Sequence, residues 1–194
     1  MPQISAQRHQ RDSPPTEGGR WPVAVVLRPP PDSDLGLRLD QLTIEAGAVA
    51  GPGHWHTGKA GSAHLTVRAL ETYRQEVDLS EPVIQRYRSA LHTAAADTGP
   101  AQIQVTGLTL TKGTVMACAV PLDPQADLLM DRFAEALGPD GWYEQPDGRR
   151  DIWYLNLLHF TTDLTSPQHL IDWVAARRTL DLGRTTIPAA ELVR

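Results

Sequence analysis

Two short motifs of the same form, His64-Leu65-Thr66 and His159-Phe160-Thr161, combine residue types that can move protons to and from a substrate. Each motif lies in a run rich in β-branched, aromatic and other apolar residues, which predicts a β-strand. Because side chains two positions apart on a strand share a face, each motif places an imidazole beside a hydroxyl. Two such pairs facing each other across a cleft would supply an acid, a base and two hydroxyl donors.

This set of groups suits the hydrolysis of a phosphodiester. Unperturbed imidazole titrates near pH 6.5, so one ring can be neutral while the other is protonated. The neutral ring would take a proton from the attacking water or hydroxyl, and the imidazolium would give one to the leaving oxygen. Thr66 and Thr161 would donate hydrogen bonds to the phosphate oxygens. We therefore expect His64, Thr66, His159 and Thr161 to be catalytic, with no metal and no cofactor required.

The elements that must position these residues follow from hydrophobic spacing and from helix and turn signals. Apolar residues at helical spacing follow capping residues, and alternating runs lie between glycine- and proline-rich turns. The expected strands are residues 21–27, 61–70, 103–110, 115–120, 152–161 and 189–194, and the expected helices begin at Asp34, Ser80, Asp123 and Ser166. The order of elements is β-α-β-α-β followed by β-α-β-α-β, with one motif on the middle strand of each half.

This repeated order predicts an α+β fold with antiparallel sheets and helices packed on one face. We expect residues 21–194 to form one bilobal domain, with lobes at about 21–110 and 111–194. A pseudo-twofold axis between the lobes would bring the two motifs together at a central cleft. Residues 1–20 are rich in Gln, Arg, Ser, Pro and Gly, which predicts a disordered N-terminal tail.

Two H-x-T motifs, one in each β/α half, resemble those of the two-histidine (2H) phosphoesterase superfamily. This group includes bacterial 2′-5′ RNA ligase-like proteins and 2′,3′-cyclic nucleotide phosphodiesterases. The resemblance implies a bilobal fold with both motifs lining a central cleft. It also implies metal-independent chemistry on 2′,3′-cyclic phosphate or 2′-5′ phosphodiester linkages of small nucleotides or RNA ends, and so a role in RNA processing. By position, His64 and Thr66 match the first motif of the family, and His159 and Thr161 match the second.

One position departs from the family pattern, which usually has an apolar residue after each threonine. Val67 fits this pattern, and Thr162 does not. A second hypothesis is therefore a non-catalytic module of the same fold that binds a nucleotide. A third is a metal hydrolase that uses His54, His56 and His64, since imidazoles two positions apart can share an ion.

The glycine-flanked loop before the first motif contains three residues that could contact a substrate: Trp55, His56 and Lys59. A base stacked on a tryptophan gains about 1–3 kcal/mol. We expect these three residues to bind the base or phosphate of a nucleotide.

Composition limits the partners and the compartment. The chain has 194 residues and a formal net charge of −5, which argues against binding to long nucleic acid through its phosphates. The single cysteine excludes an intramolecular disulfide, and no apolar run reaches the length of a membrane span. The first twenty residues lack the apolar core of a signal peptide. We expect a cytoplasmic monomer that acts on a small nucleotide or an RNA terminus and does not bind membranes.

Overall fold

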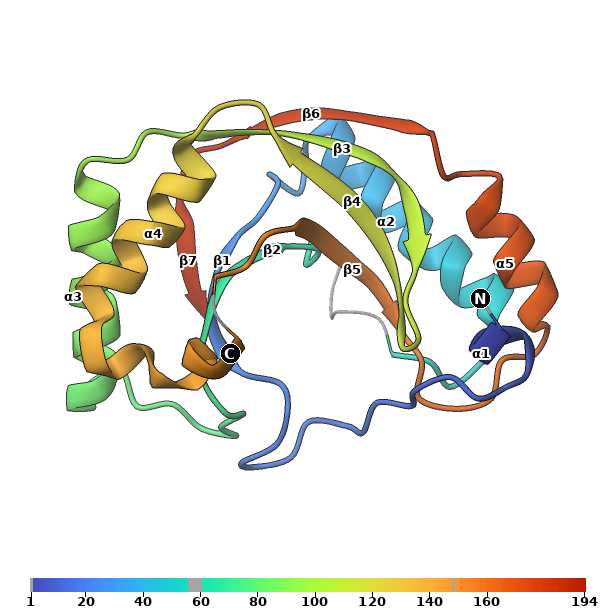
Figure 1. The fold of residues 1–194 in the computed structure, drawn as a ribbon, viewed down its shortest axis with the longest axis horizontal. Helices are drawn as coiled ribbons and strands as arrows, with labels where there is room; N and C mark the ends of the chain where they lie inside the picture. The colour runs from blue at the N-terminus through green and yellow to red at the C-terminus, as the bar shows by residue number, and fades with distance from the viewer. Residues whose placement is uncertain (1, 56–60, 148) are drawn as a thin grey trace.

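The computed structural model describes residues 2–55, 61–147 and 149–194, in which seven strands form one antiparallel sheet. The strand order is β6-β3-β4-β5-β2-β1-β7, and the sheet curls into a half-barrel (Figure 1). The strands are β1 (Val23–Leu27), β2 (Leu65–Glu71), β3 (Ala101–Leu110), β4 (Thr114–Pro121), β5 (Trp153–His159), β6 (Asp181–Ile187) and β7 (Ala190–Val193). The α+β fold class predicted from the sequence is confirmed, while β6 was not predicted.

Helices cover the sheet in two pairs, one for each lobe (Figure 1). One pair, α2 and α5, packs on the part of the sheet that contains β3, β5 and β6. In the other pair, α3 packs on α4, and α4 contacts β2. The helices are α1 (Pro2–Ser5), α2 (Asp34–Ala50), α3 (Pro82–Ala96), α4 (Gln125–Leu137) and α5 (Pro167–Ala175), with a 3-10 segment, η1 (Gly138–Asp147), after α4. The chain is therefore bilobal, with the junction of β2 and β5 between the lobes.

The lobes in space differ from the expected lobes in sequence. Strand β3 belongs to the first half of the chain but pairs with β4 and β6. Strand β7 belongs to the second half but pairs with β1. The boundary predicted at residue 110 therefore does not separate the two halves of the sheet, because each half of the chain contributes its last strand to the other half of the sheet.

Helix α2 illustrates how local sequence sets an element. The side chain of Ser33 caps the helix by accepting a hydrogen bond from the Gly36 amide at 3.1 Å. The spacing of apolar residues predicts a stripe of Leu35, Leu39, Leu42, Ala46 and Val49 on the core face of this helix. The first four are buried, and Val49 is half-buried.

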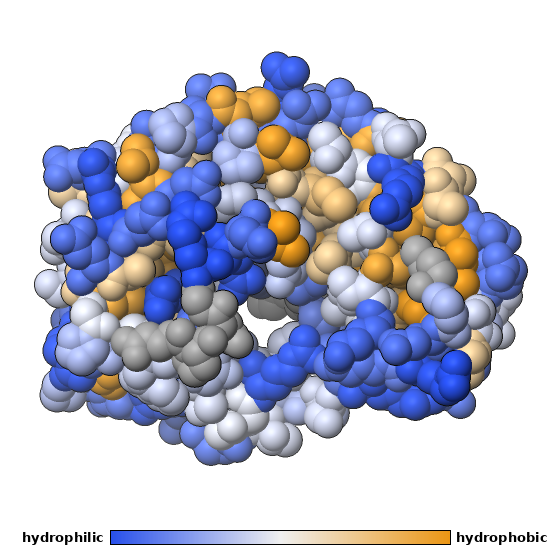
Figure 2. Space-filling model, in the orientation of Figure 1, coloured by the Kyte–Doolittle hydropathy of each residue, from blue (hydrophilic) through white to orange (hydrophobic). Residues whose placement is uncertain are grey.

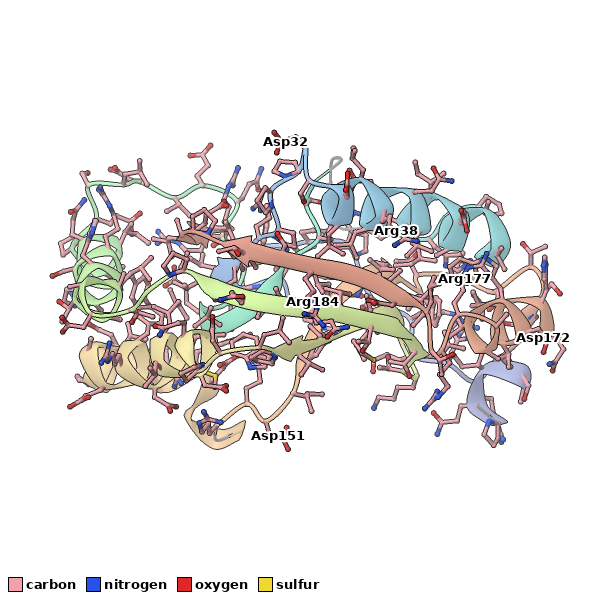
Figure 3. The ribbon with its side chains drawn as sticks, turned by 90° about the horizontal axis from the view of Figure 1, so that it is seen from above. Asp32, Arg38, Asp151, Asp172, Arg177 and Arg184 are labelled. Atoms are coloured by element: carbon pink, nitrogen blue, oxygen red, sulfur yellow. The ribbon has the colours of Figure 1, made fainter. Side chains whose placement is uncertain are left out.

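The same helix is tied to the C-terminal part of the chain by two arginines (Figure 3). Arg38 donates hydrogen bonds to the carbonyls of Asp181 and Leu182, each at 3.4 Å. Arg177 forms an ion pair with Glu45 at 3.3 Å. These contacts hold α2 beside β6 and the end of α5. None of the helices in the described residues is both long and apolar enough to cross a membrane.

The N-terminal segment is ordered against the sheet, which corrects the prediction of a disordered tail over residues 1–20. Its backbone amides donate to carbonyls at strand ends: Gln10 to Lys112 at 2.7 Å, Asp12 to Phe160 at 2.7 Å and Gly18 to Tyr73 at 2.9 Å. The side chains of Ile4, His9 and Asp12 are buried. Composition did not reveal this order, because it comes from backbone groups and from a few buried side chains. We call residues 7–21 the N-terminal strap.

Candidate active site

The two motif strands are neighbours at the centre of the sheet. Strands β2 and β5 run antiparallel and meet at the pair Leu65 and Leu155. His64 immediately precedes β2, and His159 is the last residue of β5. The lobe junction therefore brings together two histidines that are far apart in the sequence.

A β-bulge in β5 determines which way His159 faces. Asn156 pairs with Met116 and Leu158 pairs with Val115, so Leu157 is an extra residue on β5. A bulge shifts the alternation of side chains by one position. As a result Asn156 and His159, three positions apart, both line one cavity, while Leu157 and Leu158 are both buried in the core.

This cavity of about 490 Å³ contains three of the four predicted catalytic residues: His64, Thr66 and His159. Its volume lies in the range of small-molecule sites. Figure 2 shows a hollow near the middle of the molecule on the face seen in Figure 1. The other lining residues include Pro15, Arg20, Trp21, Arg28, Trp55, Ser62, Tyr73, Asn156, Val193 and Arg194.

His159 is held by a buried carboxylate from the N-terminal strap. Its Nδ1 lies 2.9 Å from Oδ2 of Asp12, and the two side chains are only 2% and 1% exposed. Arg20 forms an ion pair with the other oxygen of Asp12. Burial of the ring, followed by the positive charges of Arg20 and His64, lowers the pKa of His159 to about 4. The ring is therefore neutral at pH 7, and its Nδ1–H donates to Asp12.

His64 is oriented by a backbone carbonyl. Its Nδ1 lies 2.8 Å from the oxygen of Ser62, and because a carbonyl can only accept, Nδ1 carries the hydrogen. Burial lowers the pKa of His64, the Ser62 hydrogen bond opposes this, Arg28 lowers it further and Glu191 raises it. Nε2 of His64 is thus the nitrogen that can gain or lose a proton.

Two tryptophans surround the His159 ring. The ring centroid of Trp21 lies 4.7 Å from that of His159, and that of Trp55 lies 6.0 Å away. Trp55 and His159 also exchange two backbone hydrogen bonds, at 3.0 and 2.6 Å. Trp55, which the sequence predicted as a substrate contact, therefore forms part of the cavity wall, whereas His56 and Lys59 lie outside the described residues.

Thr161 is placed differently from the prediction. Strand β5 ends at His159, so the alternation that would put Thr161 beside the imidazole does not continue. The Thr161 hydroxyl donates to the carbonyl of Gly53, and Thr161 is not among the residues that line the cavity. Its expected role as a phosphate donor is therefore not supported by this geometry. Thr66 alone of the two threonines faces the site.

The residues proposed for a metal site do not come together in the described parts of the chain. His54 packs against Phe160, with ring centroids 5.8 Å apart, and the amide of Thr161 lies 3.4 Å from its Nδ1. His54 does not line the cavity that contains His64. Among the described residues, no group of three His, Cys, Asp or Glu side chains could hold a metal ion. The third member of the predicted set, His56, lies outside them.

Sequence reasoning missed the charged residues around the two histidines, above all Asp12, Arg20 and Arg28. Two of them lie in the segment that composition predicts to be disordered. Arg28 follows β1 directly, where the Pro29-Pro30-Pro31 turn gave no reason to single it out. A buried carboxylate beside a histidine is recognisable only from the fold, since 147 positions separate Asp12 and His159.

Comparisons with known proteins support the fold alone. No protein-family model and no curated protein sequence matches the chain. Among solved structures, the chain is similar to TT0787 of Thermus thermophilus, with 14% identity, a TM-score of 0.53 and coverage of 88% of this chain and 82% of that one. It is also similar to ATU0111 of Agrobacterium tumefaciens, a conserved protein of unknown function, with 21% identity, a TM-score of 0.52 and coverage of 89% and 81%. This chain therefore shares its overall fold with both.

Proposed function

We propose that this chain is a metal-independent phosphoesterase of the two-histidine type. Its substrates would be 2′,3′-cyclic phosphate or 2′-5′ phosphodiester linkages of small nucleotides or RNA ends. The observation that carries the proposal is that His64 and His159 line one cavity, each with Nδ1 held by an acceptor and Nε2 left for proton transfer. General acid–base chemistry needs this pairing of fixed, titratable groups.

The surroundings of the two rings suggest a role for each. The Asp12 carboxylate would stabilise an imidazolium forming on His159, so we assign His159 as the base that takes a proton from water. His64 would be protonated when an anionic substrate is bound, and we assign it as the acid. In hydrolysis of a cyclic phosphate, water attacks phosphorus and its proton passes to Nε2 of His159. The bond to the 2′ or 3′ oxygen breaks, and that oxygen receives the proton of His64.

The cavity has cationic groups for a phosphate. Arg28 and Arg20 lie close enough to His64 and His159 to lower their pKa values. Nε of Arg28 is buried with no hydrogen-bond partner among the described residues. Charge-assisted bonds from arginine to phosphate are among the stronger hydrogen bonds. Together with the Thr66 hydroxyl, these groups would stabilise the charge that builds on the phosphate oxygens.

The aromatic wall suits a nucleoside. Trp55, Trp21 and Tyr73 line the same cavity, so a base could stack on an exposed ring face. The formal net charge of −5 favours a small substrate over long RNA. We expect Trp55→Ala to weaken substrate binding, which calorimetry with a nucleoside monophosphate would measure. Unchanged affinity in this variant would remove Trp55 from the binding site.

The decisive experiment measures turnover of 2′,3′-cyclic nucleotides, and of a short RNA ending in a cyclic phosphate, by chelator-treated protein. Wild type would be compared with the His64→Ala/His159→Ala double variant. His169→Ala serves as a control, because His169 is exposed on α5. We expect turnover in wild type and in the control only. The position of the phosphate left on the product shows which bond breaks. Equal turnover in the double variant would overturn the proposal.

A binding module of the same fold is the second candidate. It is favoured by the geometry at Thr161, whose hydroxyl is engaged by Gly53 instead of facing the cavity. This candidate predicts that nucleotides bind without being converted, which calorimetry and product analysis of the same samples would measure.

Turnover that appears only when a divalent metal is added back would instead favour a metal hydrolase that includes His54 and His56. Elution as a monomer in size-exclusion chromatography would test the expected oligomeric state.

A further inference from the structure

We infer that Asp12 is a positioning residue for His159, and that the N-terminal strap is therefore a working part of the active site. This inference rests on the proposed phosphoesterase function. The strap runs below the curled sheet, from α1 on one side of the molecule to β1 in the middle (Figure 1). On its way it contributes Pro15, Arg20 and Trp21 to the cavity wall.

The carboxylate of Asp12 is buried at a cost that its partners must offset. A buried charge destabilises a protein unless it is paired and hydrogen-bonded. Within the described part of the chain, the Asp12 carboxylate has three side-chain partners: Nδ1 of His159 at 2.9 Å, Nε2 of Gln10 at 3.1 Å and the guanidinium of Arg20. Its amide donates to the carbonyl of Phe160 at 2.7 Å, which fixes the backbone beside the end of β5.

The strap is anchored at both ends, so Asp12 is held in place from two directions. Near Asp12, the Gln10 amide bonds to Lys112. Further along, Gly18 and Gly19 exchange hydrogen bonds with Tyr73, each at 2.9 Å, and the indole of Trp21 donates to the Ser13 carbonyl at 2.9 Å. These contacts join the ends of the motif strands β2 and β5 through one segment.

The state of the other ring nitrogen of His159, Nε2, indicates that the contact between Asp12 and His159 does more than anchor the strap. Nε2 is buried and has no hydrogen-bond partner among the described residues, although a buried polar atom left unpaired destabilises a protein. If His159 only anchored the strap, a residue without an unpaired polar atom could do so with less loss of stability. The unpaired lone pair beside the cavity is what a base requires, and the Nδ1–H bond to Asp12 keeps that lone pair on Nε2.

The test compares Asp12→Asn with wild type in kcat, KM and the tautomer of the His159 ring. Asparagine keeps the size of the side chain, but its amide can donate to Nδ1 and so favour the wrong tautomer. We expect kcat to fall by about 10²-fold or more, with KM unchanged. Nitrogen-15 spectra of His159 should show hydrogen on Nδ1 in wild type and a shift toward Nε2 in the variant. Asp12→Glu should recover part of kcat.

Asp163→Asn is the matched control, because it breaks the ion pair between Asp163 and Arg11 on the same strap without touching His159. It should keep wild-type kcat and tautomer.

A purely structural role of Asp12 would change the pKa of His159 in a different direction. Among the residues that the structure describes, the charged and titratable groups that face His159 are Asp12 and Arg20 of the strap and His64 beside β2. If Asp12→Asn only loosened the strap, water would reach the ring and the pKa of His159 would rise toward 6.5. If Asp12 positions the ring, loss of its negative charge leaves the positive charges of Arg20 and His64, and the pKa of His159 stays well below 6.5.

Two results would overturn the inference: wild-type kcat in Asp12→Asn, or an unchanged tautomer with a raised pKa. The tautomer measurement does not depend on turnover. If wild type converts no substrate, the proposed function fails, and the spectra still test how Asp12 orients His159.

Discussion

Asp12 and His159 are 147 positions apart, yet Oδ2 of one lies 2.9 Å from Nδ1 of the other and both side chains are buried. The site is therefore assembled from both ends of the chain and from its middle. His64 comes from the start of β2, and Val193 and Arg194 at the C-terminus line the same cavity. Any change that displaces the N-terminal strap should therefore alter the position of the His159 imidazole.

The first prediction concerns the two histidines as a unit. His64→Ala and His159→Ala should each lower kcat by about 10²–10⁴-fold, because each removes one partner of the proposed acid–base pair. The double variant should be about as slow as the slower single variant, because groups that act together are not additive. Steady-state rates on a 2′,3′-cyclic nucleotide measure this. Multiplicative losses in the double variant would show that the two rings act independently.

The second prediction separates the two threonines. Thr66→Val should lower kcat by as much as about 10²–10³-fold, the cost of losing one donor to developing charge. Thr161→Val should leave kcat unchanged, because its hydroxyl is bound to Gly53, and should lower the free energy of unfolding by about 0.5–1.5 kcal/mol. Kinetics and urea denaturation of both variants measure the two effects. A large loss of kcat in Thr161→Val would contradict the placement of its hydroxyl.

The sequence predicted most of the secondary structure because those elements are set locally. The helical spacing of Leu35, Leu39 and Leu42 predicted α2, and the turn residues at 111–114 predicted the hairpin of β3 and β4. The exchange of β3 and β7 between the halves of the sheet was not predictable, because strand pairing depends on contacts between distant segments. Strand β6 was missed because Gly183 and polar residues interrupt its apolar alternation.

The candidate site was predicted only in part, because residue spacing along one strand can be recognised in the sequence and contacts between distant segments cannot. Spacing two along a strand correctly placed His64 and Thr66 together. It failed for Thr161, because β5 ends at His159 and the alternation does not continue to Thr161, and the end of this strand leaves no clear sequence signal. Asp12 was missed because its burial depends on backbone hydrogen bonds of the strap, which composition does not report.

The third prediction is that the pH dependence of activity lies at lower pH than unperturbed imidazoles would give. Activity that needs neutral His159 should be lost as the pH falls through about 4. Activity that needs protonated His64 should be lost as the pH rises, and in kcat/KM this limb should lie below 6.5, because the pKa of free His64 is lowered. Arg28→Gln should move the alkaline limb to higher pH, since Arg28 contributes to that lowering.

Arg184→Gln is the control for Arg28→Gln, because it removes the same charge from an exposed position on β6 (Figure 3). It should leave the pH profile unchanged. A similar displacement in both variants would mean that overall charge, and not Arg28, sets the pKa of His64.

The fourth prediction links the same pKa shift to folding. The pKa of His159 is lower in the folded chain than in the unfolded one, so between pH 6.5 and about 4 the unfolded chain binds more protons. The contribution of His159 is fully present above pH 6.5 and is lost as the pH falls toward 4, by up to about 3 kcal/mol. Denaturation of wild type and His159→Gln at pH 7 and 4.5 measures it. An equal loss of stability in both proteins would show that other groups cause it.

The fifth prediction uses two glycines to test the curvature of the sheet behind the site. Gly107 lies at a bulge in β3 with φ of 48°, and a Cβ there would lie 1.9 Å from the carbonyl oxygen of Arg178. Gly107→Ala should therefore destabilise the fold by about 2 kcal/mol or more, since backbone strain and a clash with the chain after α5 add together. Gly47→Ala is the matched substitution inside α2, where a Cβ meets nothing within 4 Å, and it should stabilise by about 0.5–1 kcal/mol. Urea midpoints of the two variants should thus move in opposite directions. If Gly107→Ala were as stable as wild type, the close approach of β3 to residues 177 and 178 would be wrong, and with it the bend that curls β3 in this half of the sheet.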